Sequence, residues 1–225
     1  MSWDGNGGSG AGRRPGVPWR GRRPFVRPPD DPPGTSRLFV AVPVSDEVRV
    51  AVGELMERVA GAPIAERAFG QPRWVRVEGL HLTLRFLGAT PDEGQPALAE
   101  ALREVAAAAG PFEVTLSGGG CFPNPIHPRV LWIGIAAGGD HLVDLAESLN
   151  ERLVPLGWPL ESRPLAPHLT LARTDGVPGA DERARQLVEA ARDVRLSWQA
   201  DRVVLYKSVL GRGPTRYEVV SEVLF

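Results

Sequence analysis

The tetrapeptide His-Leu-Thr-Leu occurs twice in this chain, at residues 81–84 and 168–171. The sequence has only four histidines and seven threonines, so two identical copies indicate a duplicated element. On a β-strand, residues i and i+2 point to the same face. Each copy therefore places an imidazole and a hydroxyl on one face of its strand and two leucines on the other.

The segments around the two copies follow one order of elements twice. The first pass predicts a strand at 38–44, a helix capped by Ser45, and the motif strand to Leu87. A capping box at 90–93 then opens a helix, and a strand follows at 112–116. The second pass predicts a strand at 130–135, a helix at 142–153, the motif strand at 167–172, a helix at 184–191 and a strand at 202–206. A last strand is expected at 217–224.

This duplicated order predicts an α+β fold. Two similar lobes, each an antiparallel or mixed sheet backed by helices, would be related by a pseudo-two-fold axis and would meet at a central cleft. The spacing supports duplication, because Leu38 precedes His81 by 43 residues and Val130 precedes His168 by 38. A doubly wound sheet is disfavoured, because no glycine-rich turn of the dinucleotide-binding type follows a strand.

The composition fits a globular protein and limits the partners and the cellular compartment that we expect for it. The chain carries a formal net charge of −1 and is 43% hydrophobic, which gives no electrostatic argument for tight binding to duplex nucleic acid. The single cysteine excludes an internal disulfide and a four-cysteine zinc site. No apolar run approaches the roughly 20 residues of a membrane span. The N-terminal arginines are not followed by an apolar segment, so we do not expect a secretory signal there. We expect a monomeric cytoplasmic protein without membrane contact.

Residues 1–36 differ from the rest of the chain. They are rich in glycine, proline and serine, and they hold six arginines against three aspartates. Such a segment has too few apolar side chains to offset its ordering entropy, so we expect a disordered N-terminal extension. A solvated extension without a specific role is the favoured interpretation, and loose RNA binding is the alternative. The folded domain is expected at 37–225.

The paired motifs suit the hydrolysis of a cyclic phosphodiester. That reaction needs a base for the attacking water and an acid for the departing alkoxide, and histidine can be either near neutral pH. We predict that His81 and His168 form the acid–base pair, and that Thr83 and Thr170 hold the non-bridging phosphate oxygens. The pattern shows no carboxylate-rich or His-x-His cluster at metal-ligand spacing, so we expect no metal and no cofactor.

The chain resembles the two-histidine (2H) phosphoesterase superfamily, and within it the RNA 2′,3′-cyclic phosphodiesterases, historically called 2′-5′ RNA ligases. The resemblance implies the 2H phosphoesterase fold and conversion of RNA 2′,3′-cyclic phosphate ends to 2′-phosphomonoesters without a metal. It leaves open which histidine is the acid. The resemblance is carried by these segments, which span the folded domain: Arg37-Leu-Phe-Val-Ala41, His81-Leu-Thr-Leu-Arg-Phe-Leu-Gly88, Pro128-Arg-Val-Leu-Trp132, Pro167-His-Leu-Thr-Leu-Ala-Arg173, Leu205-Tyr-Lys-Ser208 and Arg216-Tyr217.

Other side chains are weaker candidates. Phe39 could stack on a terminal base, with core packing as the equal alternative. Arg129 could neutralise a phosphate, although a solvated strand end is also consistent with its position. If both motif strands are regular, Arg85 shares the face of the first motif whereas Arg173 faces away from the second. A nucleophilic Cys121 with His127 is disfavoured, because both lie in a glycine- and proline-rich segment expected to be a linker.

Three alternatives for the function remain open at this point. The same site could act on small cyclic nucleotides, or on 2′-5′-linked oligonucleotides. It could also belong to a non-catalytic module that binds RNA ends. The presence of both histidines argues against the last alternative, because arginine is better suited to holding a phosphate without chemistry.

Overall fold

The structure is a computed structural model that describes residues 31–62, 72–161, 163–175, 177–210 and 214–225. Most of the predicted N-terminal extension therefore lies outside the described residues, and β1 begins at Thr35, two residues before the expected start of the domain. Four α-helices lie within these ranges: α1 (Asp46–Gly61), α2 (Gln95–Ala108), α3 (Gly139–Leu153) and α4 (Ala180–Ala190). The strands are β1 (Thr35–Pro43), β2 (Arg73–Trp74), β3 (His81–Pro91), β4 (Phe112–Phe122), β5 (Val130–Ala137), β6 (His168–Arg173), β7 (Leu196–Ala200), β8 (Arg202–Val209) and β9 (Arg216–Leu224).

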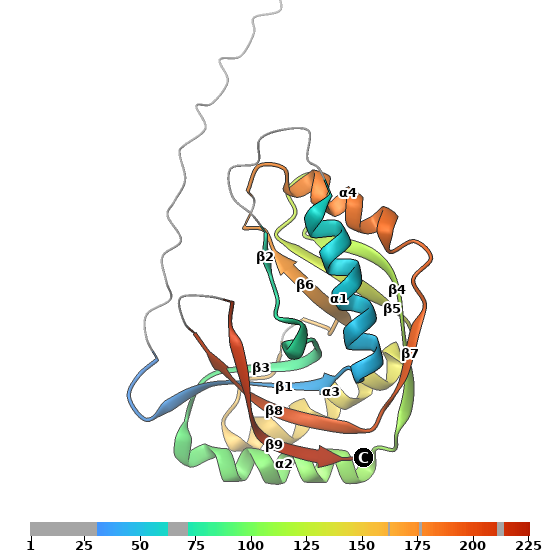
Figure 1. The fold of residues 1–225 in the computed structure, drawn as a ribbon. Helices are drawn as coiled ribbons and strands as arrows, with labels where there is room; N and C mark the ends of the chain where they lie inside the picture. The colour runs from blue at the N-terminus through green and yellow to red at the C-terminus, as the bar shows by residue number, and fades with distance from the viewer. Residues whose placement is uncertain (1–30, 63–71, 162, 176, 211–213) are drawn as a thin grey trace, which may run out of the picture. The chain divides into compact units, whose positions relative to one another are not determined.

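All nine strands belong to one antiparallel sheet (Figure 1). Its order is β7-β4-β5-β6-β3-β1-β8-β9, with β2 paired to β6. The predicted α+β class is thus confirmed, and the two motif strands β3 and β6 lie next to each other at the centre of the sheet. The two predicted lobes are the two halves of this sheet. Each half places its strands outward from the β3–β6 pair, as the expected pseudo-two-fold symmetry requires.

The two halves exchange strands, which the sequence pattern did not predict. We expected the strand at 112–116 to close the first half, but β4 pairs with β5 and β7 in the second half. Conversely, β8 pairs with β1 in the first half. The connecting helix α2 explains the first crossing: its 14 residues span about 21 Å, enough to pass the roughly 14 Å between β3 and β4 in the strand order.

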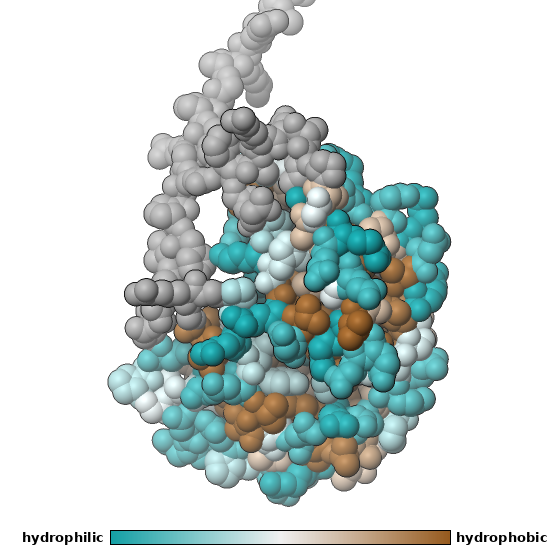
Figure 2. Space-filling view, in the orientation of Figure 1, coloured by the Kyte–Doolittle hydropathy of each residue, from teal (hydrophilic) through white to brown (hydrophobic). Residues whose placement is uncertain are grey.

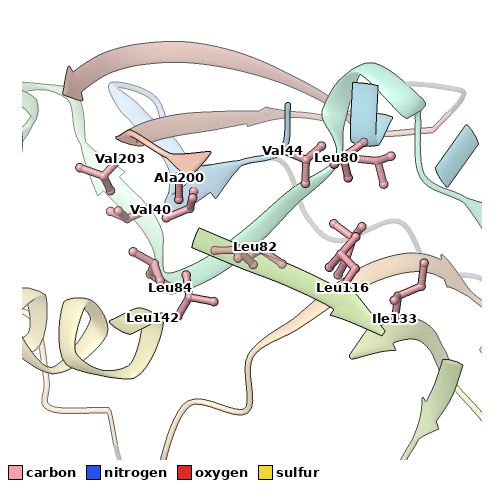
Figure 3. Close-up of a cluster of buried hydrophobic side chains, with 14 of the residues drawn as sticks. Val40, Val44, Leu80, Leu82, Leu84, Leu116, Ile133, Leu142, Ala200 and Val203 are labelled. Atoms are coloured by element: carbon pink, nitrogen blue, oxygen red, sulfur yellow. The ribbon is translucent and has the colours of Figure 1, made fainter. Parts of the chain in front are cut away.

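The leucines of the two motifs anchor the hydrophobic core. Leu82 is 1% exposed, and Leu169 and Leu171 are fully buried. They lie on the face of the sheet that the helices cover, with α3 against β3 and α4 against β4. Figure 3 shows Leu82 and Leu84 of β3 among side chains from β1, β4, β5 and α3. Burial of such leucines stabilises the fold by about 1.5–3 kcal/mol each. Because the leucines face the core, the histidine and the threonine of each motif lie on the other face of the sheet.

The segment expected to be a linker is part of the sheet. Residues 118–122 continue β4, and their glycines make room for larger neighbours. A side chain at Gly120 would come within 2.3 Å of the Trp132 ring, and one at Gly119 within 2.9 Å of the Leu187 carbonyl oxygen. These glycines therefore serve close packing across β5 and against α4, rather than flexibility.

One of the two predicted helix caps is confirmed. The Ser45 side chain accepts a hydrogen bond from the backbone N–H of Val48 at the start of α1. The prediction of a capping box at 90–93 is wrong, because β3 continues to Pro91 and Thr90 is buried. Asp92 instead accepts a hydrogen bond from the Ser36 hydroxyl at 2.6 Å, which ties it to the neighbouring strand β1.

A buried arginine joins α4 to the end of α1. Arg183 is 4% exposed, and its guanidinium donates to the carbonyl oxygens of Val59 and Ala62, the latter at 2.7 Å. We expect Arg183→Met to lower the free energy of unfolding by about 1–2 kcal/mol in urea titrations, because the substitution leaves these helix-end carbonyls without a donor. Arg185→Met is the matched control on the same helix. Its surface ion pair with Asp181 should contribute less than about 0.5 kcal/mol, so equal losses in the two variants would contradict the capping role.

The helices and the surface show where the hydrophobic residues of the protein lie. No helix in the described ranges is long and apolar enough to cross a membrane. On the face shown in Figure 2, hydrophobic residues form small groups separated by hydrophilic ones. Most of the large hydrophobic side chains in the described residues pack in the core between the sheet and its helices.

Candidate active site

The two motifs meet as neighbours across the β3–β6 ladder. Leu82 is directly opposite Leu169, so the antiparallel register sets His81 across from Thr170 and Thr83 across from His168. All four side chains lie on the face of the sheet opposite the buried leucines. In a regular ladder the diagonal pair of histidine Cβ atoms is roughly 7–8 Å apart, which leaves room for one tetrahedral anion between the rings. The pseudo-two-fold axis passes between the two leucines.

Each histidine is fixed by a backbone carbonyl two residues before it. Nδ1 of His81 lies 2.7 Å from the Gly79 carbonyl oxygen, and Nδ1 of His168 lies 2.7 Å from that of Ala166. A carbonyl oxygen can only accept, so Nδ1 carries the hydrogen in both rings. Nε2 is therefore the nitrogen that remains for a substrate, as a base when neutral and as an acid when protonated.

Aromatic rings surround both histidines, with more of them around the first. The ring centroid of His81 lies 4.8 Å from Phe39, 5.9 Å from Tyr206 and 5.1 Å from Tyr217. His168 has two such neighbours, Phe122 at 5.0 Å and Trp132 at 6.3 Å. These contacts hold each imidazole in one orientation.

Burial in this aromatic surrounding disfavours the protonated form of both histidines. It lowers the pKa of His81 to about 4, against the opposing effect of the Gly79 carbonyl, and the nearby charge of His168 lowers it further. Burial also lowers the pKa of His168, with the Arg173 charge acting in the same direction. His81 is therefore neutral at pH 7 in the free protein.

Tyr217 shows how strongly the sheet curls around the site. β9 is separated from β3 by β1 and β8, which in a flat sheet places them roughly 14 Å apart. Tyr217 nevertheless contacts the His81 ring edge-on, so the sheet must bend toward its site face. Gly79 permits this approach, because a side chain there would come within 2.8 Å of the Tyr217 ring.

A pair of symmetric bulges reverses the expected positions of two arginines. Beside β1, Val40 pairs with Arg85 and Ala41 with Thr83, so Leu84 is the extra residue of β3. The same irregularity occurs in β6 at Leu171. Each bulge shifts the alternation of side chains by one residue.

Arg85 is consequently turned into the protein and Arg173 onto the site face. Arg85 is 5% exposed and donates to the Asn150 side chain on α3 and to the Pro159 carbonyl oxygen. Arg173 pairs with Val130 across the ladder and lies close enough to His168 and Tyr217 for its charge to act on both. Burial raises the pKa of Tyr217 and lowers that of His168, and the Arg173 charge favours a lower pKa in each. The expectation that Arg85 shares the site face and Arg173 does not is therefore wrong for both residues.

The weaker candidates occupy different positions. Phe39 is on the site face but only 2% exposed, packed between His81 and Tyr206, which matches the core-packing alternative. Arg129 is exposed at the start of β5, where its backbone N–H donates to the Phe122 carbonyl oxygen. Phe86, which was not singled out from the sequence, is directly opposite Phe39 and 63% exposed. Its ring lies at the end of the site face away from Arg173.

The cysteine alternative receives no support from this arrangement. Cys121 is half-buried within β4, and burial raises the pKa of its thiol, which disfavours the reactive thiolate. His127 is exposed in the following loop. In the part of the chain that the structure describes, no group of three or more His, Cys, Asp or Glu side chains is placed to hold a metal ion.

Residues 44–212, about three quarters of the chain, match the profile of the 2′-5′ RNA ligase superfamily. The chain belongs to this superfamily. A protein of Geobacillus stearothermophilus named RNA 2′,3′-cyclic phosphodiesterase is 33% identical over 187 residues, which cover 83% of this chain and 56% of that relative. One of the same name from Thermotoga maritima is 31% identical over 189 residues, covering 84% of this chain and 95% of the relative.

Solved structures of the superfamily share the fold. The protein TT0787 of Thermus thermophilus is similar with a TM-score of 0.67 and 30% identity, over 84% of this chain and 97% of that one. Escherichia coli LigT in complex with 3′-AMP is similar with a TM-score of 0.63 and 26% identity, over 85% of this chain and 98% of that one. The predicted 2H phosphoesterase fold is thus confirmed.

Proposed function

We propose that this protein hydrolyses RNA ends bearing a 2′,3′-cyclic phosphate to 2′-phosphomonoesters, without a metal ion. One observation carries the proposal: the two motifs meet across one ladder, with both Nδ1 atoms held by backbone carbonyls and both Nε2 atoms left for a substrate. Relatives that match most of this chain are named RNA 2′,3′-cyclic phosphodiesterase, which supports the substrate and the type of reaction.

The reaction needs only one proton accepted and one donated. Nε2 of one histidine takes a proton from water, whose oxygen forms a new bond to phosphorus. The bond from phosphorus to the 3′ oxygen breaks, and Nε2 of the other histidine gives that oxygen its proton. The product carries a 2′-phosphate and a free 3′-hydroxyl. Thr83 and Thr170 donate hydrogen bonds to the two non-bridging oxygens and hold the phosphorus in line between the rings.

The pKa of His81 favours a catalytic role over a purely binding one. A histidine with a pKa of about 4 carries no charge at pH 7, so it cannot hold a phosphate electrostatically in the free protein. Its neutral Nε2 is instead suited to exchanging protons with a bound group. A bound phosphate anion would raise the pKa of both histidines, so the substrate itself promotes uptake of the one proton that the reaction needs.

The assay offers the full chain an RNA oligonucleotide with a 2′,3′-cyclic phosphate end in excess EDTA. We expect conversion to the 2′-phosphomonoester, identified against synthetic 2′- and 3′-phosphate standards. Loss of turnover in EDTA would contradict the metal-free mechanism, and a 3′-phosphate product would contradict departure of the 3′ oxygen. Faster cleavage of a 2′-5′-linked oligonucleotide in the same assay would favour that alternative substrate.

A further inference from the structure

Tyr217 reaches the site from the edge strand β9, and its neighbours hold its ring in place. The ring lies edge-on to the rings of His81 and Phe39, and the centroid distance is 5.1 Å in both contacts. Gly79 packs against the same ring, because a side chain there would come within 2.8 Å of it. A ring confined in this way gives its hydroxyl a defined position.

The hydroxyl of Tyr217 lies toward the second motif. Burial raises the pKa of Tyr217, and the charge of Arg173 opposes this rise, so the hydroxyl is within reach of that guanidinium. Arg173 is the last residue of β6, and its charge also acts on His168. The ring of Tyr217 contacts the first histidine, and its hydroxyl is close to a group beside the second. The hydroxyl therefore faces the part of the site where the phosphate is expected.

Tyr206, in the same aromatic cluster, has its hydroxyl in different surroundings. Its ring stacks on Phe39 at 5.3 Å. Burial raises the pKa of Tyr206 as well, but the charges that act on it are those of Glu222, Arg49 and Arg202. These residues belong to β9, α1 and β8. Of the two tyrosine hydroxyls near His81, that of Tyr217 is thus the one associated with both motifs.

The Tyr217 hydroxyl is available as a hydrogen-bond donor. Among the described residues it has no hydrogen-bond partner. Because burial raises its pKa, the phenol keeps its proton throughout the pH range in which the histidines titrate. A half-buried donor without a protein acceptor is suited to an acceptor that arrives with a ligand, and phosphate oxygens are strong acceptors.

A phenylalanine takes the corresponding place beside the second histidine. Phe122 lies edge-on to His168 at 5.0 Å and 85°, and Tyr217 lies edge-on to His81 at 5.1 Å and 88°. The two contacts have nearly the same geometry, but only one of the rings carries a hydroxyl. Phe122 shows that packing against a histidine needs no hydroxyl, so the hydroxyl of Tyr217 is free for a different role.

We propose that the Tyr217 hydroxyl donates a hydrogen bond to the phosphate between the two histidines, as a third neutral donor beside Thr83 and Thr170. The inference rests on the proposed function. Negative charge builds up on the non-bridging oxygens as water attacks phosphorus, so a donor already in position stabilises the transition state more than the bound substrate. The threonines approach the phosphate from the sheet, and Tyr217 approaches it from the curled edge.

The test compares Tyr217→Phe with Tyr206→Phe, because each variant keeps both rings and removes one hydroxyl. Tyr217→Phe should lower kcat about 10- to 100-fold, the range expected for the loss of one hydrogen bond to a charged group. The loss should be similar on adenosine 2′,3′-cyclic phosphate and on a short RNA with the same end, and KM should change less than about threefold. The loss in Tyr206→Phe should be at least about fivefold smaller.

The ring signals of His81 separate the role of the hydroxyl from that of the ring. Because Tyr217→Phe keeps the ring, the NMR titration of His81 and the midpoint of urea unfolding should match those of wild type. A lower rate accompanied by a shifted His81 titration would assign the effect to the aromatic surroundings and overturn the proposal. A rate in Tyr217→Phe equal to that of wild type or of Tyr206→Phe would also overturn it.

Phosphate binding separates this inference from the proposed function. Isothermal titration calorimetry with inorganic phosphate measures affinity whether or not hydrolysis occurs. If wild type hydrolyses neither substrate, the proposed function fails while the binding experiment still decides the inference. Weaker phosphate binding in Tyr217→Phe than in Tyr206→Phe would support it. Equal binding in the two variants, or no binding of phosphate by wild type, would overturn it.

Discussion

Replacing either motif histidine is expected to reduce kcat on an RNA 2′,3′-cyclic phosphate by about 10²–10⁴-fold, the usual contribution of positioned acid–base catalysis. His81→Gln and His168→Gln keep a side chain of similar volume in the aromatic surroundings, so the loss should come from chemistry rather than folding. Because both histidines serve one coupled proton transfer, the double variant should be little worse than the poorer single variant. Single-turnover hydrolysis of labelled RNA measures these rates.

A substrate with a better leaving group will show which histidine is the acid. A cyclic phosphodiester whose departing alcohol has a low pKa needs little protonation, so it should restore much of the rate in the variant that lacks the acid. The variant that lacks the base should remain slow. His141→Gln is the matched control, because His141 stacks on Phe112 in the helix layer and should retain full activity. More than half of the wild-type rate in either motif variant would contradict the acid–base assignment.

Sequence periodicity was sufficient for the motifs themselves and failed just beyond them. The alternation of a strand correctly separates His81 and Thr83 from Leu82, which faces the core, because residues 81–83 lie within regular ladder. One position after these residues a bulge inserts an extra residue, as it does in the second motif, and this reverses the faces of Arg85 and Arg173. A bulge is defined by the register with the partner strand, which the pattern of one strand does not contain.

The aromatic neighbours of the histidines could not be predicted from the sequence either, for a different reason. Tyr206 and Tyr217 lie more than 120 residues after His81, and they reach it only because β8 crosses into the first half and the sheet curls. Phe122 reaches His168 by the converse exchange of β4. Strand exchange depends on how α2 and α4 pack, so local patterns predicted the elements but not their neighbours.

The free energy of unfolding should fall as the pH is lowered from about 6.5 toward 4, and His81 should cause much of this fall. Its pKa is about 4 in the folded protein, whereas an unfolded histidine has a pKa of about 6.5, so the unfolded chain binds the proton first. The stabilisation that comes from the lowered pKa of His81 is therefore fully present above pH 6.5, and it is lost as the pH falls toward 4. The loss due to His81 should be about 2–3 kcal/mol, and the lowered pKa of His168 adds in the same direction.

Urea unfolding of wild type and His81→Gln between pH 7.5 and 4.5 measures this contribution. The stability of wild type should decline more steeply than that of the variant, so that their difference changes by about 2 kcal/mol across the range. His127→Gln, in the exposed loop after β4, controls for the introduction of glutamine. The ring signals of His81 followed by NMR should titrate near pH 4. Parallel stability curves for wild type and His81→Gln, or titration of His81 near pH 6.5, would show that the aromatic surroundings do not hold this imidazole neutral.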